Sequence, residues 1–385
     1  MPGRHCLSLI ISAVVALPLL PARAEAVGPF ATIPAEYATP LAALRSPLLF
    51  DDDQSAAAPQ PASGHRSHAV KSAAEWPARR AEILADWHHI MGAWPAVIEH
   101  PKVEVLATTQ RGDITQRRVR VEIAPGQTGE GYVLLPPGTG PFPAVYVPYY
   151  EPETSVGLGD EKHQQRDFAW QLAQRGFVAL AMGSPGGDAR KPVLCAGAQC
   201  QPLSYLGYLS ANAWQTLAAM PEVDSKRIGI VGHSYGGKWA MFGSCLWEKY
   251  AAAVWSDPGV VFDETRGSIN YQEPWYLGLD ATQPTRKPGL VSNESPRTGP
   301  YKTLIETGHN LQELQALMAP RPFLVSGGEE DPPKRWAVLA HAVAVNALLG
   351  HTDRVAMTNR PAHPPTAESN AQVIAFFEHW LGRTR

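Results

Sequence analysis

Residues 227–242 read RIGIVGHSYGGKWAMF, and this stretch decides the fold. Its first part is rich in β-branched residues and predicts a buried strand, while its last part predicts a helix. Gly232 and Gly236 occupy the two positions of the tight connection where a side chain would collide with neighbouring main chain. Ser234 lies between them, on a strained turn at the start of the helix, where free N–H groups and the helix dipole favour negative charge. The stretch therefore predicts a serine nucleophile presented between a strand and a helix.

Apolar runs and helical patterns alternate on both sides of this stretch. Strands are expected at 142–147, 177–182, 251–255, 322–325 and 355–358, and helices at 164–175, 205–220 and 370–381. A helix at 72–91 and three strands at 103–109, 117–123 and 130–135 precede them. Strands that alternate with helices are typical of a parallel sheet covered on both faces. We therefore expect an α/β fold with a mostly parallel, doubly wound central sheet that begins with antiparallel strands.

The chain divides into a leader, an N-terminal segment and one large domain. In residues 1–24, Arg4 and His5 precede an apolar run and an Ala-x-Ala site, which predicts a signal peptide and export to the periplasm or the medium. The run is too short to cross a bilayer, so no membrane span is expected. Residues 25–71 are rich in Ala, Pro and Ser and predict an extended or disordered segment. Residues 72–385 form the domain, and the weak secondary-structure signals at 258–315 predict a cap or lid that faces the substrate.

The composition limits the classes of partner. The 385 residues carry a formal net charge of -3, and 18% of them are charged. This balance argues against a nucleic acid or an anionic membrane surface as a partner. Eleven Trp and twelve Tyr are enough to line a cleft for sugars or aryl groups, and also to pack the core. The oligomeric state is left open.

The cysteines indicate a disulfide rather than a metal site. Cys195 and Cys200 are close in sequence, and in an exported protein this spacing predicts a disulfide between them. Cys245 follows the nucleophile on the same helix and is expected to be a buried apolar residue. No second Cys/His pair stands at ligand spacing near Cys195 and Cys200, so no metal is expected.

A serine hydroxyl becomes a nucleophile only when a base removes its proton and a third group orients that base. His363, in the turn-rich loop after the last expected strand, is the candidate base. The candidate acid is Asp331, in the turn after the preceding expected strand, with Glu330 second and Glu329 third. Asp257, in the turn one strand earlier, is the main rival, and capping of that turn is the alternative role for it.

Backbone N–H groups near the serine are the expected donors to an oxyanion. The first is the N–H of Tyr235, the residue after the nucleophile. The second is expected from the loop after the strand at 142–147, where Tyr149 or Tyr150 would donate through its backbone or its phenol. Packing of these rings in the wall of the cleft is the alternative.

Three further residues are candidates for binding substrate. Lys238 lies one helical turn beyond the nucleophile, where it would reach a hydroxyl or carboxylate of a sugar, unless it packs against the helix or is solvated. Trp275 and Tyr276 lie in the expected cap, where aromatic rings suit a sugar or an aryl group.

Three motifs together resemble the α/β-hydrolase superfamily. They are GHSYGGK at 232–238, SGGEEDPP at 326–333 and HPP at 363–365. The resemblance covers about residues 75–385 and is greatest to an exported branch whose members are dienelactone hydrolase-like, acetyl xylan esterase-like or prolyl oligopeptidase-like. A Gly-Gly-x-x-Asp-Pro turn matches the superfamily pattern for the acid, which favours Asp331.

The sequence is also distantly similar to the glucuronoyl esterases, whose corresponding stretch reads GCSRxGK. His233 and Tyr235 stand here in place of the Cys and the Arg, so the motif is incomplete. A true dienelactone hydrolase uses a cysteine nucleophile, and Ser234 argues against that activity.

The resemblance implies a serine hydrolase that cleaves carboxylic esters through an acyl-enzyme on Ser234, with no metal or organic cofactor. The implied substrate is a small ester or an ester-decorated carbohydrate. A serine peptidase of the prolyl oligopeptidase-like type and a noncatalytic binding protein on the same scaffold are the alternatives. Such peptidases usually carry a propeller domain, for which this chain has no room.

Overall fold

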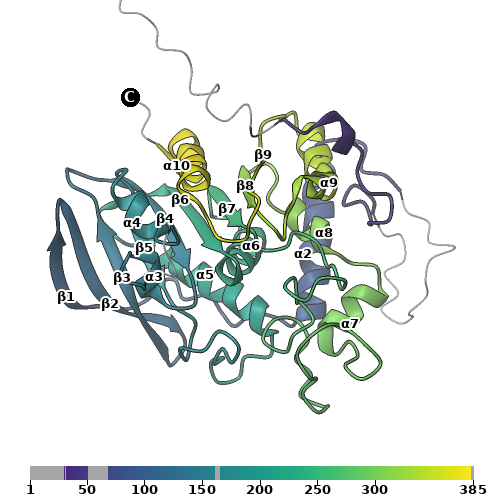
Figure 1. Ribbon diagram of the computed structural model, residues 1–385, viewed down its shortest axis with the longest axis horizontal. Helices are drawn as coiled ribbons and strands as arrows, with labels where there is room; N and C mark the ends of the chain where they lie inside the picture. Colours follow the sequence, from purple (N-terminus) through teal and green to yellow (C-terminus); the bar gives the residue numbers. More distant parts are fainter. Residues whose placement is uncertain (1–29, 31, 51–67, 161–164, 383–385) are drawn as a thin grey trace, which may run out of the picture.

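The computed structural model describes residues 30, 32–50, 68–160 and 165–382, and the expected signal peptide lies outside them. Nine strands within these residues form one sheet in the order β1-β2-β3-β5-β4-β6-β7-β8-β9 (Figure 1). The strands are β1 (Val103–Arg111), β2 (Ile114–Ala124), β3 (Gln127–Leu135), β4 (Phe142–Pro148), β5 (Val178–Met182), β6 (Val223–His233), β7 (Ala252–Ser256), β8 (Phe323–Gly327) and β9 (Val355–Asn359). The β1–β2, β2–β3 and β3–β5 pairs are antiparallel, and the remaining pairs are parallel. The structure confirms the mostly parallel sheet with an antiparallel beginning.

Helices cover both faces of the sheet (Figure 1). One face carries α2 (Trp76–Met91), α5 (Pro202–Ala218), α6 (Tyr235–Leu246) and α9 (Trp336–Leu348), and the other carries α4 (Phe168–Ala173) and α10 (Ala367–Leu381). Each face has its own hydrophobic core. Along β4, Ala144 and Tyr146 pack into the core on the side of α5 and α6, while Val145 and Val147 pack into the core on the side of α4 and α10. Because a strand buried on both faces must be apolar throughout, β4 has a continuous apolar sequence.

Two helices differ from the expected elements. The helix expected at 164–175 is the shorter α4, because Gln165 has a φ of 65° and this left-handed backbone cannot belong to a right-handed helix. The buried α9 has no counterpart among the expected elements. Its sequence is apolar on nearly every side and so carries no amphipathic stripe. The N-terminal segment packs against α9, where the Leu41 N–H donates to the Ala337 carbonyl at 3.2 Å.

The segment expected as a cap, 258–315, includes α7 (Gly299–Glu306) and most of α8 (Leu311–Ala316). A buried ion pair holds its long irregular part, because Arg286 Nη1 lies 3.1 Å from Glu273 Oε2 and both side chains are almost fully buried. Glu273 also accepts a hydrogen bond from the Gly289 N–H at 2.7 Å. Buried charges are tolerated when they are paired and hydrogen-bonded. This pair therefore fixes the backbone conformation of a segment that has little regular secondary structure.

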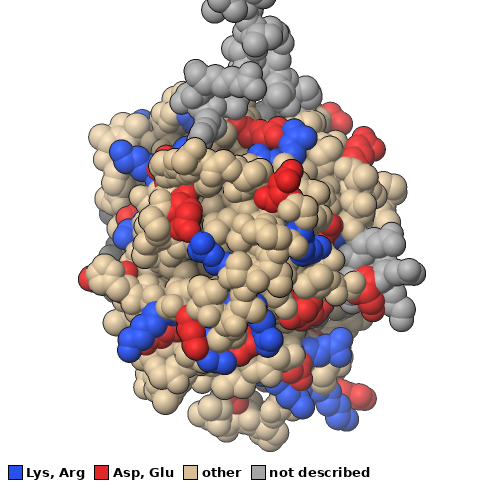
Figure 2. All heavy atoms as spheres, turned by 90° about the vertical axis from the view of Figure 1, so that its left-hand side faces the viewer, with Lys and Arg blue, Asp and Glu red and all other residues tan. Residues whose placement is uncertain are grey.

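Basic and acidic side chains are interspersed on the face of the molecule shown in Figure 2. On the antiparallel strands β1 to β3, Arg120 pairs with Glu104 and Glu130, and Arg118 also pairs with Glu130. Exposed pairs of this kind contribute little to stability, but they leave no extended patch of one sign on these strands. Among the described residues, no helix combines the length and the apolar character needed to cross a bilayer.

The carboxyl ends of the last four strands meet at one edge of the sheet. These ends are His233 of β6, Ser256 of β7, Gly327 of β8 and Asn359 of β9. The loops that follow carry every residue expected as nucleophile, acid or base. In open α/β sheets, ligands bind outside the carboxyl ends of the strands, so an active site is expected at this edge of the sheet.

Candidate active site

Ser234 occupies the strained turn that the sequence predicts between β6 and α6. Its φ of 57° and ψ of -115° lie outside the usual regions, and its N–H donates to the Ser256 carbonyl at 2.8 Å. A Cβ atom on Gly232 would lie 2.0 Å from the Gly236 carbonyl oxygen, and one on Gly236 would lie 2.3 Å from the Pro148 carbonyl oxygen. These distances are far inside van der Waals contact, so only glycine fits at the two positions. The crowded turn holds the serine hydroxyl at the start of α6.

His363 lies beside this hydroxyl, on the loop after β9. Its Nε2 is 2.9 Å from Ser234 Oγ, and its Nδ1 is 2.6 Å from Asp257 Oδ2. Arg360 shapes the loop, because its Nη2 donates to the carbonyl oxygen of His363 and its Nε donates to that of Pro364. This buried arginine has no counterpart among the residues expected for the site, and only its place just before the histidine loop in the sequence points to it. The two distances from its nitrogens show that the His363 ring bridges the hydroxyl of Ser234 and the carboxylate of Asp257.

Asp257, at the end of β7, is the carboxylate that orients His363. Its Oδ1 accepts hydrogen bonds from the N–H groups of Gly328 at 2.7 Å and Asp331 at 2.9 Å. The side chain is fully buried, and its backbone φ of 53° is again left-handed. Burial raises the pKa of Asp257, but the hydrogen bond and charge of His363, together with Arg360, outweigh this and lower the pKa below its usual value. The carboxylate is thus held in its charged form.

The expectation that Asp331 contacts the histidine is wrong. Its carboxylate instead accepts hydrogen bonds from the N–H groups of Gly259 at 2.8 Å and Val260 at 2.7 Å. Asp331 is completely buried, and burial together with the negative charge of Asp257 raises its pKa to about 6. The turn after β8 directs this side chain toward the loop after β7. Asp331 therefore supports the backbone that follows Asp257.

The two lower-ranked acids also face other partners. Glu330 Oε2 accepts from Arg266 Nε at 3.1 Å, and Glu329 is largely exposed with its carboxylate 3.8 Å from the same guanidinium. The backbone N–H of Glu330 lies 3.3 Å from Asp257 Oδ2. The turn after β8 therefore serves Asp257 through its main chain rather than through its side chains.

The expected oxyanion donors differ in what their groups already bind. Tyr235 is the first residue of α6, so its N–H has no partner within the helix. The Tyr149 N–H donates to the Met182 carbonyl at 3.1 Å, which excludes it as a backbone donor. Tyr150 donates from its backbone to no carbonyl in the described part of the chain, and its phenol interacts with Ser234. The structure therefore favours Tyr150 over Tyr149 as the second donor.

His233 lies under the base as a neutral ring. It is buried, its Nδ1 is 3.1 Å from Ser256 Oγ, and its centroid is 4.7 Å from that of His363. Burial, together with nearby positive charges that include Arg360, lowers the pKa of His233 well below its usual value. The low pKa makes His233 a weak base, so its ring supports the turn at Ser234 without competing for the proton of the serine.

Lys238 is not placed as a ligand of substrate would be. The residue is buried, its Nζ donates to the Pro258 carbonyl, and it lies 4.6 Å from the centre of the Tyr271 ring. Burial lowers the pKa of Lys238 to about 8. Pro258 directly follows Asp257, so the ammonium group holds the loop that carries this carboxylate.

The two aromatic candidates of the cap have different surroundings. Tyr276 is buried and packs at 5.5 Å from the Tyr235 ring. Trp275 is partly buried, and the exposed Arg190 guanidinium lies 5.9 Å from its ring. Trp275 is therefore the one of the two whose ring remains accessible to a ligand.

The cysteine expectation is not met, because Cys195 and Cys200 are free and buried thiols in the structure. Burial raises the pKa of Cys200 to about 12, which disfavours the reactive thiolate. Cys245 is buried on α6 as expected. Within the described ranges, no three His, Cys, Asp or Glu side chains gather in a way that would hold a metal ion.

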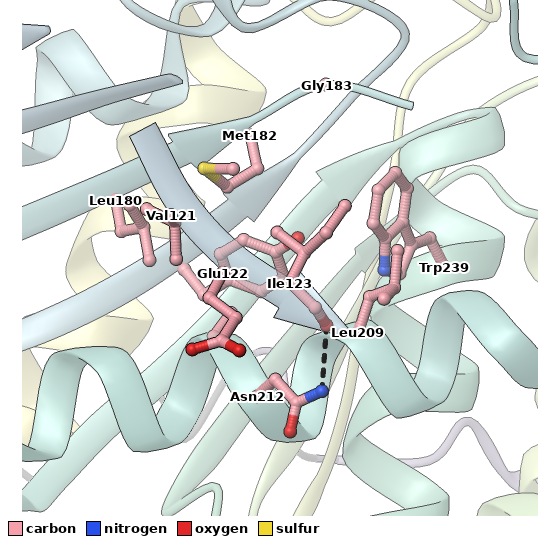
Figure 3. Close-up of a pocket in the computed structure, with 11 residues that line it drawn as sticks. Val121, Glu122, Ile123, Leu180, Met182, Gly183, Leu209, Asn212 and Trp239 are labelled. Carbon is pink, nitrogen blue, oxygen red and sulfur yellow. Dashed lines mark hydrogen bonds between the residues drawn. The ribbon is translucent and has the colours of Figure 1, made fainter. Parts of the chain in front are cut away.

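Figure 3 shows a small apolar pocket between the sheet and the helices α5 and α6, lined by residues such as Leu180, Leu209 and Trp239. Asn212 borders it and donates through Nδ2 to the Ile123 carbonyl at 2.8 Å. No residue of the serine, histidine and carboxylate array lines this pocket, so it is a gap in the core packing and not the place of reaction.

Comparison with known proteins shows the fold. No protein-family model matches the chain, and no curated protein matches it. A glucuronoyl esterase from Solibacter usitatus is similar in structure, with a TM-score of 0.66 at 18% identity over 89% of this chain and 99% of that chain. A promiscuous esterase of carbohydrate esterase family 15 from a marine bacterial metagenome has a TM-score of 0.61 at 16% identity, over 89% and 98% of the two chains. A glucuronoyl esterase from Teredinibacter turnerae has a TM-score of 0.59 at 18% identity, over 87% and 88%. The chain has the α/β-hydrolase fold.

Proposed function

We propose that this protein is a serine hydrolase that cleaves carboxylic esters, with Ser234 as nucleophile, His363 as base and Asp257 as acid. The observation that carries the proposal is the unbroken run of contacts from Asp257 Oδ2 through the imidazole to Ser234 Oγ. These three side chains are far apart in the sequence and meet at one edge of the sheet. Two of the three residues, Ser234 and Asp257, have a positive φ of the kind that favours glycine. Strain of this kind is retained where a reaction requires the geometry.

The geometry supports acyl transfer in two steps. His363 Nε2 takes the proton of Ser234 as its oxygen attacks the ester carbonyl carbon, and Asp257 stabilises the imidazolium that forms. The N–H groups of Tyr235 and Tyr150 donate to the oxyanion. The attack forms a tetrahedral intermediate that carries this oxyanion. Its collapse breaks the bond to the alcohol, which leaves with the proton from the imidazolium. Water then attacks the carbonyl carbon of the acyl-enzyme as His363 Nε2 takes its proton. The bond between Ser234 Oγ and the acyl group breaks, Oγ regains its proton from the imidazolium, and the acid product leaves.

The proposed substrates are small esters and ester-decorated carbohydrates. The solved structures with similar folds include glucuronoyl esterases and a promiscuous esterase of carbohydrate esterase family 15. The accessible Trp275 offers an apolar ring of the kind on which a sugar stacks. Tyr235 stands where the glucuronoyl esterase motif has Arg, so the specificity differs from that of a complete motif. Export through the leader at 1–24 belongs to the same proposal, since polymeric carbohydrate lies outside the cell.

The test is turnover of 4-nitrophenyl acetate by the wild type and by Ser234→Ala. We expect the substitution to abolish turnover while thermal unfolding stays unchanged. Ser225→Ala, at an exposed serine on β6, is the matched control and should retain full activity. Unchanged turnover in Ser234→Ala would remove the proposal.

A substrate panel then defines the class of ester. Acetylated xylan, methyl glucuronate and feruloyl esters would be assayed beside a set of aminoacyl anilides. Cleavage of the anilides with no cleavage of any ester would indicate a peptidase instead.

A further inference from the structure

Arg166 lies at the edge of the candidate active site, just before α4, and has no role in the array described above. Its Nη1 donates to the phenol oxygen of Tyr149 at 3.1 Å. The Tyr149 ring lies 4.8 Å from that of Tyr150, whose phenol interacts with Ser234. Burial raises the pKa of Tyr150, and both Ser234 and the positive charge of Arg166 oppose that rise. Two tyrosine rings, those of Tyr149 and Tyr150, thus connect the guanidinium to the serine.

The side of the guanidinium that binds carboxylates is free. Arg166 Nε is buried without a hydrogen-bond partner, and Nη2 makes no hydrogen bond within the described part of the chain. Nε and Nη2 form the edge that pairs with both oxygens of a carboxylate. Nearby acids are engaged elsewhere, since Glu151 accepts from Thr154 Oγ1 and Asp167 accepts from Gln171 Nε2. No carboxylate of residues 68–160 or 165–382 lies within ion-pair distance of Arg166.

The backbone holds Arg166 in this position. The preceding residue, Gln165, is one of four non-glycine residues with positive φ in the described chain, and Ser234 and Asp257 are two of the others. Asn370, buried in the first turn of α10, donates through Nδ2 to the Gln165 carbonyl at 2.7 Å. A strained residue persists only where its surroundings fix it, and such residues cluster at functional sites. The same kind of strain therefore places the serine, its acid and this arginine.

We propose that Arg166 binds a free carboxylate on the acyl part of the substrate, so that the preferred substrate is an ester of a dicarboxylic or otherwise acidic acyl group. The inference rests on the proposed ester hydrolysis. The acyl part is favoured over the alcohol because Arg166 is bonded to the loop that supplies the oxyanion donor Tyr150. A buried Nε that has lost water without gaining a partner regains a charged hydrogen bond when the carboxylate binds.

The test compares esters of equal chain length with and without the charge. Mono-4-nitrophenyl adipate and mono-4-nitrophenyl glutarate carry the carboxylate, and 4-nitrophenyl hexanoate and pentanoate do not. We expect the wild type to have the higher kcat/KM on the charged esters. Arg166→Gln should lower kcat/KM on the charged esters about 10- to 100-fold, mainly through KM, and change the neutral esters less than about threefold.

Two control variants separate geometry from charge. Arg166→Lys keeps the charge but loses the two-point edge, and should give an intermediate loss on the charged esters. Arg118→Gln removes one positive charge from an exposed position on β2 and should leave the preference unchanged. An equal loss on charged and neutral esters in Arg166→Gln, or no preference for charged esters in the wild type, overturns the proposal. A wild type that cleaves none of the four esters defeats the proposed function itself.

Discussion

The identity of the acid leads to a comparison of two substitutions, Asp257→Asn and Asp331→Asn. The groups that contact the Asp257 carboxylate are all donors, namely His363 Nδ1 and the N–H groups of Gly328, Glu330 and Asp331. An asparagine amide has one acceptor oxygen, so its NH2 would face a donor. Either the imidazole loses its acceptor and its tautomer, or the turn after β8 loses its anchor. The variant should therefore fail in orienting the base.

The expected sizes of the two effects differ widely. The same change to the acid of a well-characterised serine peptidase lowers kcat about ten-thousandfold, which is about 5 kcal/mol at 1.36 kcal/mol per factor of ten. Asp331 only receives the N–H groups of Gly259 and Val260, and an asparagine keeps one of them. Losing one such bond costs about 1 kcal/mol, so Asp331→Asn should lower kcat less than about tenfold.

Initial rates with 4-nitrophenyl acetate give kcat and KM for both variants. We expect kcat to fall by three to four orders of magnitude in Asp257→Asn with KM little changed. Thermal unfolding of the same samples checks that both variants are folded. A larger loss in Asp331→Asn than in Asp257→Asn would refute the assignment of the acid and return it to the residue that the sequence motif favours.

Three further predictions concern residues around the array. Burial raises the pKa of Asp331 from 3.8 to about 6, so the folded state holds this proton more tightly than the unfolded state does. The resulting stability is fully present below pH 3.8 and is lost as the pH rises through 6. Denaturant unfolding should show the free energy of unfolding of the wild type falling over this range by up to about 3 kcal/mol relative to Asp331→Asn. Tyr150→Phe keeps the backbone N–H, so kcat should fall less than about tenfold, and a hundredfold loss would show that the phenol is the oxyanion donor. Lys238→Met removes the donor to the Pro258 carbonyl beside Asp257, so kcat should fall with KM unchanged, whereas a raised KM would indicate a direct contact with substrate.

The sequence was sufficient for the fold, and for the serine and the histidine that the structure brings together, because their signals are local. Gly232 and Gly236 mark the turn between β6 and α6 in the sequence, since the backbone there leaves no space for a Cβ atom. His363 follows the last strand in a loop rich in proline, and no other histidine has that position. By contrast, α9 shows no helical period because its face toward the sheet and its face toward the N-terminal segment are both apolar.

The choice between two acids could not be made from local sequence, because the two loops support each other. Asp257 receives N–H groups from the turn after β8, and Asp331 receives N–H groups from the loop after β7. Each carboxylate is buried at the same edge of the sheet, and each lies in the loop after a parallel strand. Only the direction of each side chain separates them, and the left-handed φ of 53° at Asp257 sets that direction. Aspartate tolerates a left-handed backbone in turns better than most residues do, so the strain alone would also fit a turn cap. The 2.6 Å contact between Asp257 Oδ2 and His363 Nδ1 is what argues for a role beyond capping.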